Sequence, residues 1–434
     1  MPSPSSSFCR SPSGPGLIPV LALTLAGSIH LALPGMNLTG VDLPGASTAL
    51  AAQTPSGPGN AGDAPVFESE LHDFRVVTVA EGLRDPWSMA FLPGGDLLIT
   101  EKPGRLRIVR NGVLQPDPIP GTPDVRHQGQ GGLLEVALHP EFQANRLLYL
   151  SYAKPSPDGS QGTTAVARAR FDGERLTELE EIFVAEGWST AGSHYGGKLA
   201  FDPEGHLFIT VGDRGASPLA GPRDQHPAQA LTNHQGTVVR LLDDGQVPED
   251  NPFVGQAHAL PEIWSYGHRN PQGLDIDMET GDVWSTEHGP QGGDELNLIL
   301  PGRNYGWPVI GYGVQYGGTP IHEARERDGM EQPLQFWTPS IATSGLLLYT
   351  GERFPEWQGH LLVGGLDGRQ IARVPIVEGE DGYQPGRLER PGLLMGFGRI
   401  RDIRQGPDGF VYIAIDDRRG GGLTPVVRLE PVEP

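Results

Sequence analysis

Cysteine, lysine and net positive charge are all scarce in this chain of 434 residues. Cys9 is the single cysteine, so no intramolecular disulfide can form, and any export of the protein does not depend on one. The formal net charge is −21, which leaves no basic surface to neutralise phosphates and argues against a nucleic-acid partner. Only three of the 32 basic residues are lysines (Lys102, Lys154 and Lys198), so most cations at a binding site must be arginines.

The sequence also lacks long amphipathic helical segments with capping residues. Glycine and proline, with 62 and 42 residues, make up more than a fifth of the chain, and they fall between apolar runs instead of in one tract. That distribution is typical of turns between short strands and not of disorder. We therefore expect an all-β protein.

The first fifty residues are expected to be a targeting segment. Arg10 precedes the mostly apolar stretch 17–33, and the tripeptide Ala-Leu-Ala at 49–51 fits the small-x-small cleavage pattern. A membrane anchor is the alternative, but Pro19, Pro34 and the modest length of the stretch argue against a span. The sequence therefore predicts a periplasmic or secreted protein without a membrane span in its mature form, divided into a signal peptide (1–51), a flexible lead-in (52–66) and one folded domain (67–434).

One pattern recurs along the rest of the chain: an apolar run, a turn containing proline or glycine, and a second apolar run. Each copy is predicted to be two strands joined by a hairpin turn. The six copies are WSMAFLPGGDLLIT (87–100), LLEVALHPEFQANRLLYLSY (133–152), KLAFDPEGHLFITVGD (198–213), GLDIDMETGDVWSTEHG (273–289), LLLYTGERFPEWQGHLLVGG (346–365) and IRDIRQGPDGFVYIAID (400–416).

Six copies of a β unit at a long period predict a six-bladed β-propeller of four-stranded antiparallel blades. The 368 residues from 67 to 434 give about 61 per copy, a length that also allows seven or eight blades. We expect the surplus in long loops, where function usually resides. Because an open ring would leave exposed strand edges, we expect the strand at 74–80 and the strand at 426–429 to share one blade and close the ring.

A histidine in a glycine-rich turn is the first candidate for chemistry. His194 lies in GSHYGGK (192–198) just before a predicted strand, and Asp213 ends the hairpin that follows. A buried carboxylate beside a histidine fixes its tautomer and raises its basicity, as a general base requires. The alternatives are a surface or packing role for His194 and a simple turn-forming role for Asp213.

Two further loops combine polar residues with glycine and proline. In YGHRNPQG (266–273), Arg269, Asn270 and Gln272 are closer together than a solvated loop needs, so we favour a functional role. In EHGPQGGDE (287–295), a Gly-Pro turn is flanked by acids. It offers the carbonyl and carboxylate oxygens that Ca²⁺ prefers, although a plain turn is the alternative.

Arg399 and Arg401 are separated by one residue in a predicted strand. Residues i and i+2 of a strand point to the same face, so the two guanidinium groups project together. Paired guanidiniums suit the recognition of carboxylates. The alternatives are a solvated charge ladder or a pair that meets acids of this same chain.

Taken together, these motifs resemble the soluble dehydrogenases of aldoses and glucose that depend on pyrroloquinoline quinone (PQQ), a family that includes sorbosone dehydrogenase-like proteins. The similarity covers about 74–429, and six motifs occur in the family's order: GQGGLLEVALHP, GSHYGGKL, GHRNPQGL, EHGPQGGDELN, NYGWP and RIRD. The resemblance implies a six-bladed propeller that binds PQQ and Ca²⁺ and oxidises sugars.

The resemblance also assigns roles to individual residues. It implies that His194 is the catalytic base, that Asp213 orients it and that Arg269 is directed at a quinone oxygen. The cofactor-binding residues that it implies are Gln130, Arg269, Asn270, Arg399 and Arg401. The calcium-binding residues that it implies are Gly289 and Pro290 for the active-site ion, through their carbonyls, and Gly311, Tyr312 and Glu331 for a structural ion.

The sequence departs from the family at three positions. Ser193 stands where glucose-type members have Asp, and His288 stands where they have Gln, which bears on glucose selectivity. Asp367 stands where the family often has a lysine that reaches a PQQ carboxylate. If the segment is extended there, Arg369 points to the same side as Asp367, and we expect Arg369 to make that contact, with Asp367 bracing its guanidinium.

The implied reaction is oxidation of an aldose at C1 to the lactone, with histidine-assisted hydride transfer to PQQ. The implied partners are a small sugar and an external electron acceptor, and the expected assembly is a monomer or homodimer. One alternative function is a cofactor-free ligand-binding propeller, which would not need His194, Asp213 and three convergent arginines. The other is a calcium-dependent lactonase, which would need several carboxylates around its metal.

Overall fold

Six antiparallel sheets make up the computed structural model of this protein, which describes residues 64–380, 382–416 and 422–432. The predicted signal peptide at 1–51 and most of the predicted lead-in lie outside the described residues. None of the helices in the described part of the chain has the length and apolar character needed to span a bilayer.

Five of the sheets each contain four strands that pair with their neighbours in chain order. The first two sheets are β3 (Pro86–Phe91), β4 (Leu97–Glu101), β5 (Arg105–Arg110) and β6 (Val113–Leu114), then β7 (Leu133–Leu138), β8 (Leu147–Pro155), β9 (Gly162–Phe171) and β10 (Leu176–Val184). The third and fourth are β11 (Leu199–Phe201), β12 (Leu207–Val211), β13 (Thr237–Leu241) and β14 (Ile263–Tyr266), then β15 (Pro271–Ile276), β16 (Val283–Glu287), β17 (Asp294–Leu298) and β18 (Gln335–Trp337). The fifth is β19 (Thr343–Leu348), β20 (His360–Gly365), β21 (Gln370–Gly379) and β22 (Gly382–Pro385).

The sixth sheet joins the two ends of the domain. It consists of β23 (Arg399–Gln405), β24 (Val411–Asp416), β25 (Thr424–Pro431), β2 (Phe74–Leu83) and β1 (Val66–Phe67). β2 pairs with β25 from Phe74–Pro431 to Leu83–Thr424, which confirms the predicted closure of the ring. In this blade the two-residue strand β1 pairs with β2 and extends the four strands β2, β25, β24 and β23 at the outer edge.

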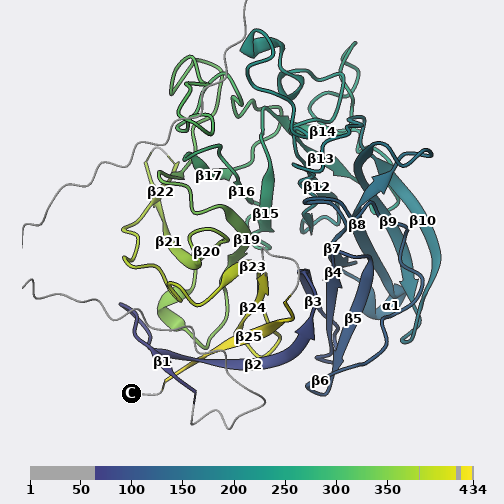
Figure 1. Cartoon of the computed structure of the whole chain (residues 1–434), viewed down its shortest axis with the longest axis vertical. Helices are drawn as coiled ribbons and strands as arrows, with labels where there is room; N and C mark the ends of the chain where they lie inside the picture. The colour runs from purple at the N-terminus through teal and green to yellow at the C-terminus, as the bar shows by residue number, and fades with distance from the viewer. Residues whose placement is uncertain (1–63, 381, 417–421, 433–434) are drawn as a thin grey trace, which may run out of the picture. The chain divides into compact units, whose positions relative to one another are not determined.

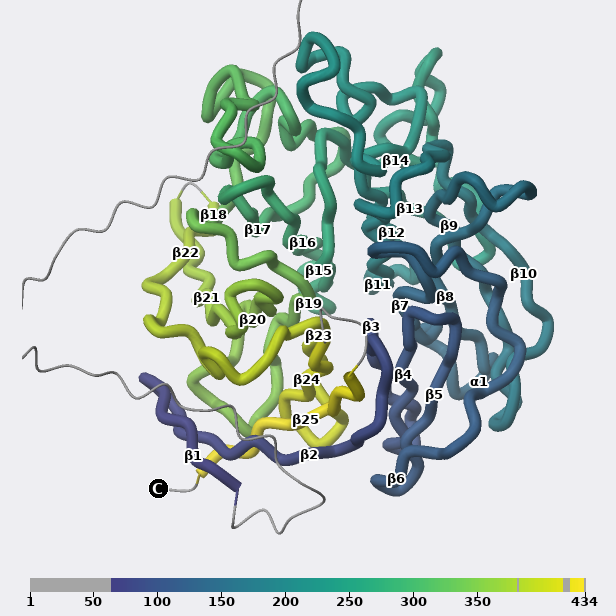
Figure 2. The backbone as a smooth tube through the Cα atoms, in the orientation of Figure 1, coloured from purple at the N-terminus to yellow at the C-terminus, as the bar shows by residue number. Residues whose placement is uncertain are grey.

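The first strands of successive sheets contact one another in cyclic order, from β3 through β7, β11, β15, β19 and β23 back to β3. They lie around the middle of the ring, as Figures 1 and 2 show. The protein is therefore a six-bladed β-propeller, as the six repeats predicted. Helical structure in the described residues is limited to α1 (Phe142–Asn145) and the short 3-10 helices η2 (Arg223–Gln225), η3 (Pro227–Gln229) and η4 (Pro355–Trp357).

Six hydrophobic clusters fill the spaces between neighbouring sheets. Successive residues of the second strand in each sheet point to opposite faces and pack on opposite neighbours, which is why these strands are apolar on both faces. Residues of neighbouring sheets that share one cluster are Leu98 and Leu148, Tyr149 and Leu207, Phe208 and Leu274, Trp284 and Leu361, Leu362 and Ile413, and Tyr412 and Leu97.

The topology brings the predicted site residues to one end of the ring. In each antiparallel hairpin, the start of the first strand and the end of the second lie at the same edge. His194 precedes β11 and Asp213 follows β12, while Arg269 precedes β15 and Gly289 follows β16. Arg399 begins β23 at the same edge.

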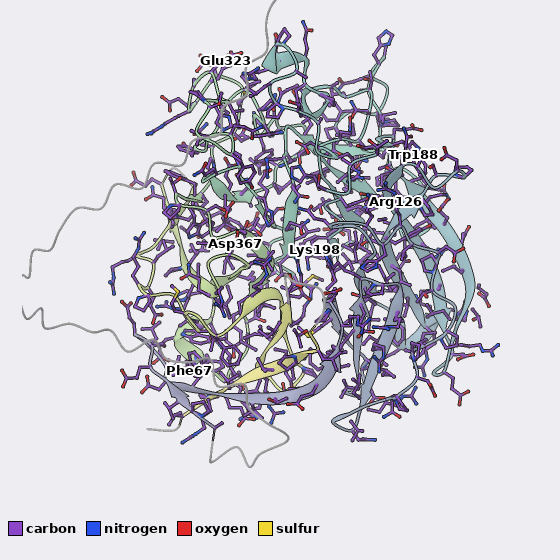
Figure 3. The ribbon with its side chains drawn as sticks, viewed as in Figure 1. Phe67, Arg126, Trp188, Lys198, Glu323 and Asp367 are labelled. Carbon is purple, nitrogen blue, oxygen red and sulfur yellow. The ribbon has the colours of Figure 1, made fainter. Side chains whose placement is uncertain are left out.

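A buried network of charges crosses the middle of the ring. The Nζ atom of Lys198, whose side chain is 2% exposed, lies 2.8 Å from Asp402 Oδ1 and 2.9 Å from Glu135 Oε2. Arg404 pairs with the same two carboxylates. Glu135 belongs to β7 and Asp402 to β23, so the network joins the inner strands of separate blades, with Lys198 near the middle of Figure 3.

We expect the substitution Lys198→Met to lower the free energy of unfolding by about 3–5 kcal/mol, because it leaves two buried carboxylates facing one remaining cation. The matched control is Lys154→Met. Lys154 pairs with Glu181 where both side chains are about a third exposed, so its loss costs less than about 1 kcal/mol. Urea unfolding of both variants and the parent measures the difference, and equal stability of the two variants would contradict the role of Lys198.

Candidate active site

A pocket of about 490 Å³ opens at this end of the ring. This volume is in the range of small-molecule sites. Its wall is built from strands of four sheets and from loops that connect the strands: Asp85, Trp87, Lys102, His127, Gly129, Gln130, Leu134, Tyr195, Gly196, Gln272, His288, Tyr316, Ala342, Leu366, Asp367, Arg399, Arg401 and Asp416. Three of the predicted cofactor-binding residues, Gln130, Arg399 and Arg401, are among them.

The predicted base and its orienting carboxylate are in contact. His194 Nδ1 lies 2.6 Å from Asp213 Oδ1, and the indole Nε1 of Trp307 donates to Asp213 Oδ2 at 2.8 Å. Burial alone would raise the pKa of the Asp213 carboxyl, but His194, Arg269 and the Gly215 amide together lower it below its usual range. An ionised Asp213 only accepts hydrogen bonds, so Nδ1 carries the proton and Nε2 of His194 is free to act as a base.

His194 does not itself line the pocket but lies at its edge, next in sequence to the lining residue Tyr195 and bonded to the lining residue Gln130. Gln130 Oε1 accepts a hydrogen bond from the His194 backbone amide at 2.7 Å. The loop that carries Gln130 needs glycine, because a Cβ on Gly129 would lie 2.3 Å from the Gly192 carbonyl. The GQGG and GSH motifs are thus packed together to fix the position of His194.

Arg269 is held by the backbone that follows β16. Its Nη1 donates to the carbonyls of Gly289 at 2.8 Å and His288 at 3.1 Å, and its guanidinium lies 5.2 Å from the ring centre of Trp307. Trp307 therefore links Arg269 and Asp213. The NYGWP motif, which carries Trp307, thus completes the site around the base.

The buried polar atoms near the pocket that have no hydrogen-bond partner in the described residues include the donors Asn270 Nδ2 and Arg269 Nε. Asn270 is fully buried, and its Oδ1 accepts from the Gly196 amide at 3.2 Å. An unpartnered buried donor costs about 1–3 kcal/mol. Both donors are therefore available to a ligand with oxygen or nitrogen acceptors.

Arg399 and Arg401 meet acids of this chain, as one of the alternatives anticipated. Arg399 Nη1 lies 2.7 Å from Asp367 Oδ1, and both arginines lie 3.5 Å from Asp416 Oδ2. Both also line the pocket, so they remain within reach of a bound anion.

The structure does not bring Arg369 into the pocket. Residues 366–369 form the turn between β20 and β21, and Arg369 is exposed with a φ of +49°. The expectation of an extended segment at 367–369 was therefore wrong, and Asp367 contacts Arg399 instead.

A second cavity of about 20 Å³, enough for one water-sized occupant, lies next to Arg269 and His288. Four of the five predicted calcium-binding residues line it together: Gly289, Pro290, Gly311 and Tyr312. The structure thus brings the two predicted sets to one place. Glu331 is not among the lining residues, and it pairs with Arg303 at 3.5 Å.

Two carboxylates reach this cavity from a cross-strand pair. Glu287 in β16 is the register partner of Glu295 in β17, and the Asn297 amide donates to both, at 3.3 and 3.2 Å. Like charges in this arrangement are repulsive, and burial together with Glu287 raises the pKa of the Glu295 carboxyl. A divalent cation that prefers carboxylate and carbonyl oxygens would relieve this repulsion, so the donor set fits Ca²⁺.

His288 lines both cavities. Its Nε2 is buried without a partner in the described residues, and burial, together with Arg269 and Arg401, lowers the pKa of His288 to about 3. His288 is therefore a neutral group between the two cavities at physiological pH.

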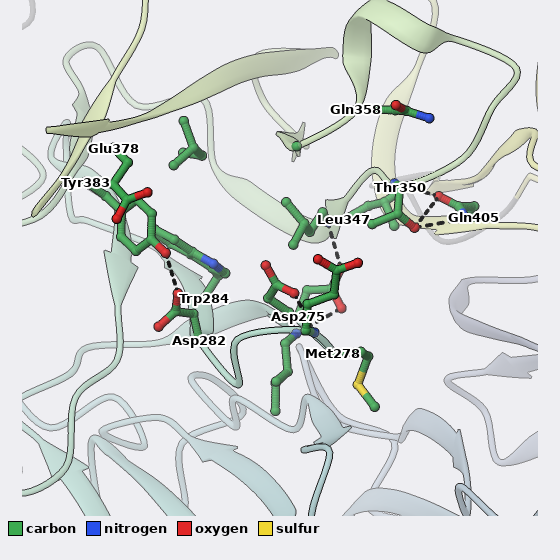
Figure 4. A pocket seen from close by; sticks show the side chains of 16 residues that line it. Asp275, Met278, Asp282, Trp284, Leu347, Thr350, Gln358, Glu378, Tyr383 and Gln405 are labelled. Carbon is green, nitrogen blue, oxygen red and sulfur yellow. Dashed lines mark hydrogen bonds between the residues drawn. The ribbon is translucent and has the colours of Figure 1, made fainter.

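A larger cavity of about 810 Å³ lies at the opposite end of the ring. Figure 4 shows the side chains that line it. It opens beside Asp275 and Leu348, near the far ends of β15 and β19, and its wall includes Trp284 and Tyr383. Five carboxylates line it, and none of its lining residues is Lys, Arg or His. It therefore offers neither a histidine base nor a cation for an acidic cofactor.

The described residues contain one cluster of three side chains of metal-ligand type, formed by Asp202, Glu204 and His206. This cluster also lies at the opposite end, in the turn between β11 and β12. Arg240 Nη2 lies 3.2 Å from His206 Nε2, which disfavours a cation there.

Sequence reasoning missed several residues of the pocket, of which Lys102 is the clearest. Lys102 directly follows β4, a position equivalent to that of Gly212 after β12 and His288 after β16, each of which directly precedes a predicted site residue, Asp213 or Gly289. Aligning the six repeats on their second strands would have identified it. Trp87 and Tyr316 also line the pocket, and neither belongs to a motif with a chemical signature.

Comparison with known proteins shows the family of this chain. The family model described as glucose/sorbosone dehydrogenase matches residues 83–424. Aldose sugar dehydrogenase YliI of Escherichia coli is 40% identical over 349 residues, which cover 80% of this chain and 91% of that protein. The crystal structure of the soluble aldose sugar dehydrogenase from Escherichia coli in the apo-form has a TM-score of 0.75 at 36% identity, covering 83% of this chain and 100% of that one.

The PQQ-bound form of aldose sugar dehydrogenase from Streptomyces coelicolor has a TM-score of 0.62 at 27% identity, covering 83% of this chain and 98% of that one. The family model spans all six sheets, and the relatives are matched over nearly their whole lengths. The chain therefore belongs to the glucose/sorbosone dehydrogenase family, with aldose sugar dehydrogenases and PQQ-dependent glucose dehydrogenases as its homologues.

Proposed function

We propose that this protein oxidises aldoses at C1 to the lactone, with bound PQQ and Ca²⁺, and passes the electrons to an external acceptor. The observation that supports this most strongly is the contact between His194 and Asp213 at the edge of a pocket whose wall carries Lys102, Arg399 and Arg401. A base beside a cluster of cations suits a hydroxyl-bearing substrate and an acidic cofactor.

The residues present fit both groups. The cations of the pocket and the unpartnered donors of Asn270 and Arg269 suit a planar cofactor with carboxylates and carbonyl oxygens. Glu287, Glu295 and the backbone around Gly289 would hold the calcium ion. When bound, PQQ supplies the group that accepts the hydride, and calcium supplies Lewis-acid polarisation of the quinone.

The protein's own part in the reaction is to orient the sugar and move a proton. Nε2 of His194 takes the proton of the C1 hydroxyl as hydride leaves the same carbon. Asp213 keeps the proton on Nδ1 and stabilises the imidazolium that forms. Trp307 fixes the second oxygen of Asp213, which keeps the imidazole plane in one orientation.

One observation supports the lactonase alternative: two carboxylates reach the small cavity. That cavity, at about 20 Å³, leaves no space for a lactone ring beside a metal ion. The neighbouring pocket, which has the space, contains the cations that a lactonase would not need. We therefore retain the dehydrogenase as the proposed function.

Reconstitution tests the proposal. The purified cofactor-free protein is mixed with PQQ and CaCl₂, and the absorbance of the bound quinone is followed before and after an aldose is added. We expect the quinone band to bleach and the lactone to appear. Lactone hydrolysis without PQQ would support the lactonase, and sugar binding without any bleaching would support the binding module.

A further inference from the structure

We infer that Lys102 is a cofactor-binding residue that contacts a carboxylate of the bound cofactor and forms, with Arg399 and Arg401, the cationic wall of the pocket. The inference rests on the proposed function, because it takes the pocket to hold an acidic cofactor. It assigns to Lys102 the contact that the sequence alone had assigned to Arg369.

The first support is the distribution of charge in the wall. Arg399 and Arg401 already face the carboxylates of Asp367 and Asp416. Among the described residues, no carboxylate oxygen lies within the 4.0 Å ion-pair distance of Lys102 Nζ. Of the three cations in the wall, Lys102 is therefore the one that has no direct contact with a carboxylate of the described residues.

The second support is the hydrogen bonding of the ammonium group. The contact of Lys102 Nζ with the Gly129 carbonyl is long, at 3.5 Å, although an ammonium group has three donors. Gly129 and the next residue, Gln130, line the same pocket. The ammonium group thus lies beside the loop that fixes His194, with donor capacity left for an anion.

The surroundings of Lys102 disfavour its charged form. Burial, followed by the charges of Arg401 and Arg399, lowers the pKa of Lys102, and Asp416 and Asp85 only partly oppose this. A partly buried cation without a close counter-ion destabilises the protein that carries it. A bound carboxylate would supply the missing counter-ion, so cofactor binding offsets a cost that is built into the cofactor-free fold.

Arg369 does not have these features. It is exposed, it lies in a turn at a φ of +49°, and it is not among the residues that line the pocket. Lys154, the exposed lysine paired with Glu181, provides a control for the loss of a lysine elsewhere. Substitutions at the three positions therefore separate a pocket cation from a surface cation.

The experiment measures PQQ affinity by equilibrium titration of the cofactor-free protein, without substrate, at two salt concentrations. We expect Lys102→Met to weaken PQQ binding by about 10- to 100-fold, the range for a charge-assisted hydrogen bond. Its affinity should also fall less steeply with added NaCl. Lys102→Arg should retain most of the affinity, and Arg369→Ala and Lys154→Met should bind PQQ as the parent does.

Thermal unfolding of the cofactor-free variants separates cofactor binding from a structural role. Because Lys102 has no close counter-ion, Lys102→Met should unfold at the same temperature as the parent or higher. A lower unfolding temperature, or PQQ affinity equal to that of the parent, would overturn the inference. A large loss of affinity in Arg369→Ala with none in Lys102→Met would return the contact to Arg369.

A second probe, benzene-1,3,5-tricarboxylate in calcium-free buffer, distinguishes this inference from the proposed function. If the parent does not bind PQQ but binds the tricarboxylate through Lys102, the proposed function fails and the anion-binding role of Lys102 stands. If the parent binds PQQ and loss of Lys102 changes neither ligand, the inference fails and the proposed function stands.

Discussion

Replacing His194 with alanine is expected to lower turnover of the PQQ-loaded enzyme by about 10²–10⁴-fold, the usual contribution of a general base. The side chain contributes Nε2 at the edge of the pocket, and its other nitrogen is occupied by Asp213. The contact with Gln130 is made by the backbone amide of His194 and survives the substitution. PQQ affinity should therefore remain nearly that of the parent.

Asp213→Asn is the matched variant for this prediction. It keeps the shape of the side chain but removes the charge that fixes the tautomer of His194, and it should slow turnover less than the loss of the imidazole. Steady-state kinetics at saturating PQQ and aldose give both values. Near-parental turnover in His194→Ala would show that His194 is only a turn residue.

Chelation of divalent cations is expected to abolish activity, and addition of calcium is expected to restore it. Glu287 and Glu295 are opposed across the strand pair, and a cation between them relieves their repulsion as well as activating the cofactor. Glu295→Gln should weaken calcium binding by at least about tenfold, the scale seen when metal-site groups are removed.

Glu331→Gln is the control for the metal site, because Glu331 pairs with Arg303 and does not line the small cavity. Calcium titration, followed by the thermal unfolding temperature and by activity, compares the three proteins. Full activity after long incubation in excess chelator would count against a calcium requirement. Equal calcium affinity of Glu295→Gln and the parent would place the ion elsewhere.

The sequence predicted the propeller because the repeated unit is local. Each hairpin combines two apolar runs with a turn, and the second strand is apolar on both faces because it packs between two neighbouring sheets. Residues 207 and 208 illustrate this, since Leu207 packs toward the second sheet and Phe208 toward the fourth. The six hairpins and the closing pair of strands follow from such patterns, but the short edge strand β1 has no comparable signal.

The contact between His194 and Asp213 was also predicted from the sequence, for the same reason. Both residues flank one hairpin, so antiparallel pairing of β11 and β12 brings them to the same edge. The Asp213–Trp307 contact joins residues 94 positions apart, and it depends on how a long loop returns to the middle of the ring.

By itself, then, the sequence determined the number of blades, the closure of the ring and the contact between His194 and Asp213. Only the tertiary structure decided which cations face the pocket, because that depends on the backbone angles of single turn residues and on packing between blades. At Arg369 a positive φ turns the chain away from the expected extended path, and Glu331 pairs with Arg303 outside the small cavity. Lys102 belongs to no motif, yet ring closure places it beside Arg401, which belongs to the last blade of the chain. Such contacts between distant segments are made by the fold and leave no local pattern in the sequence.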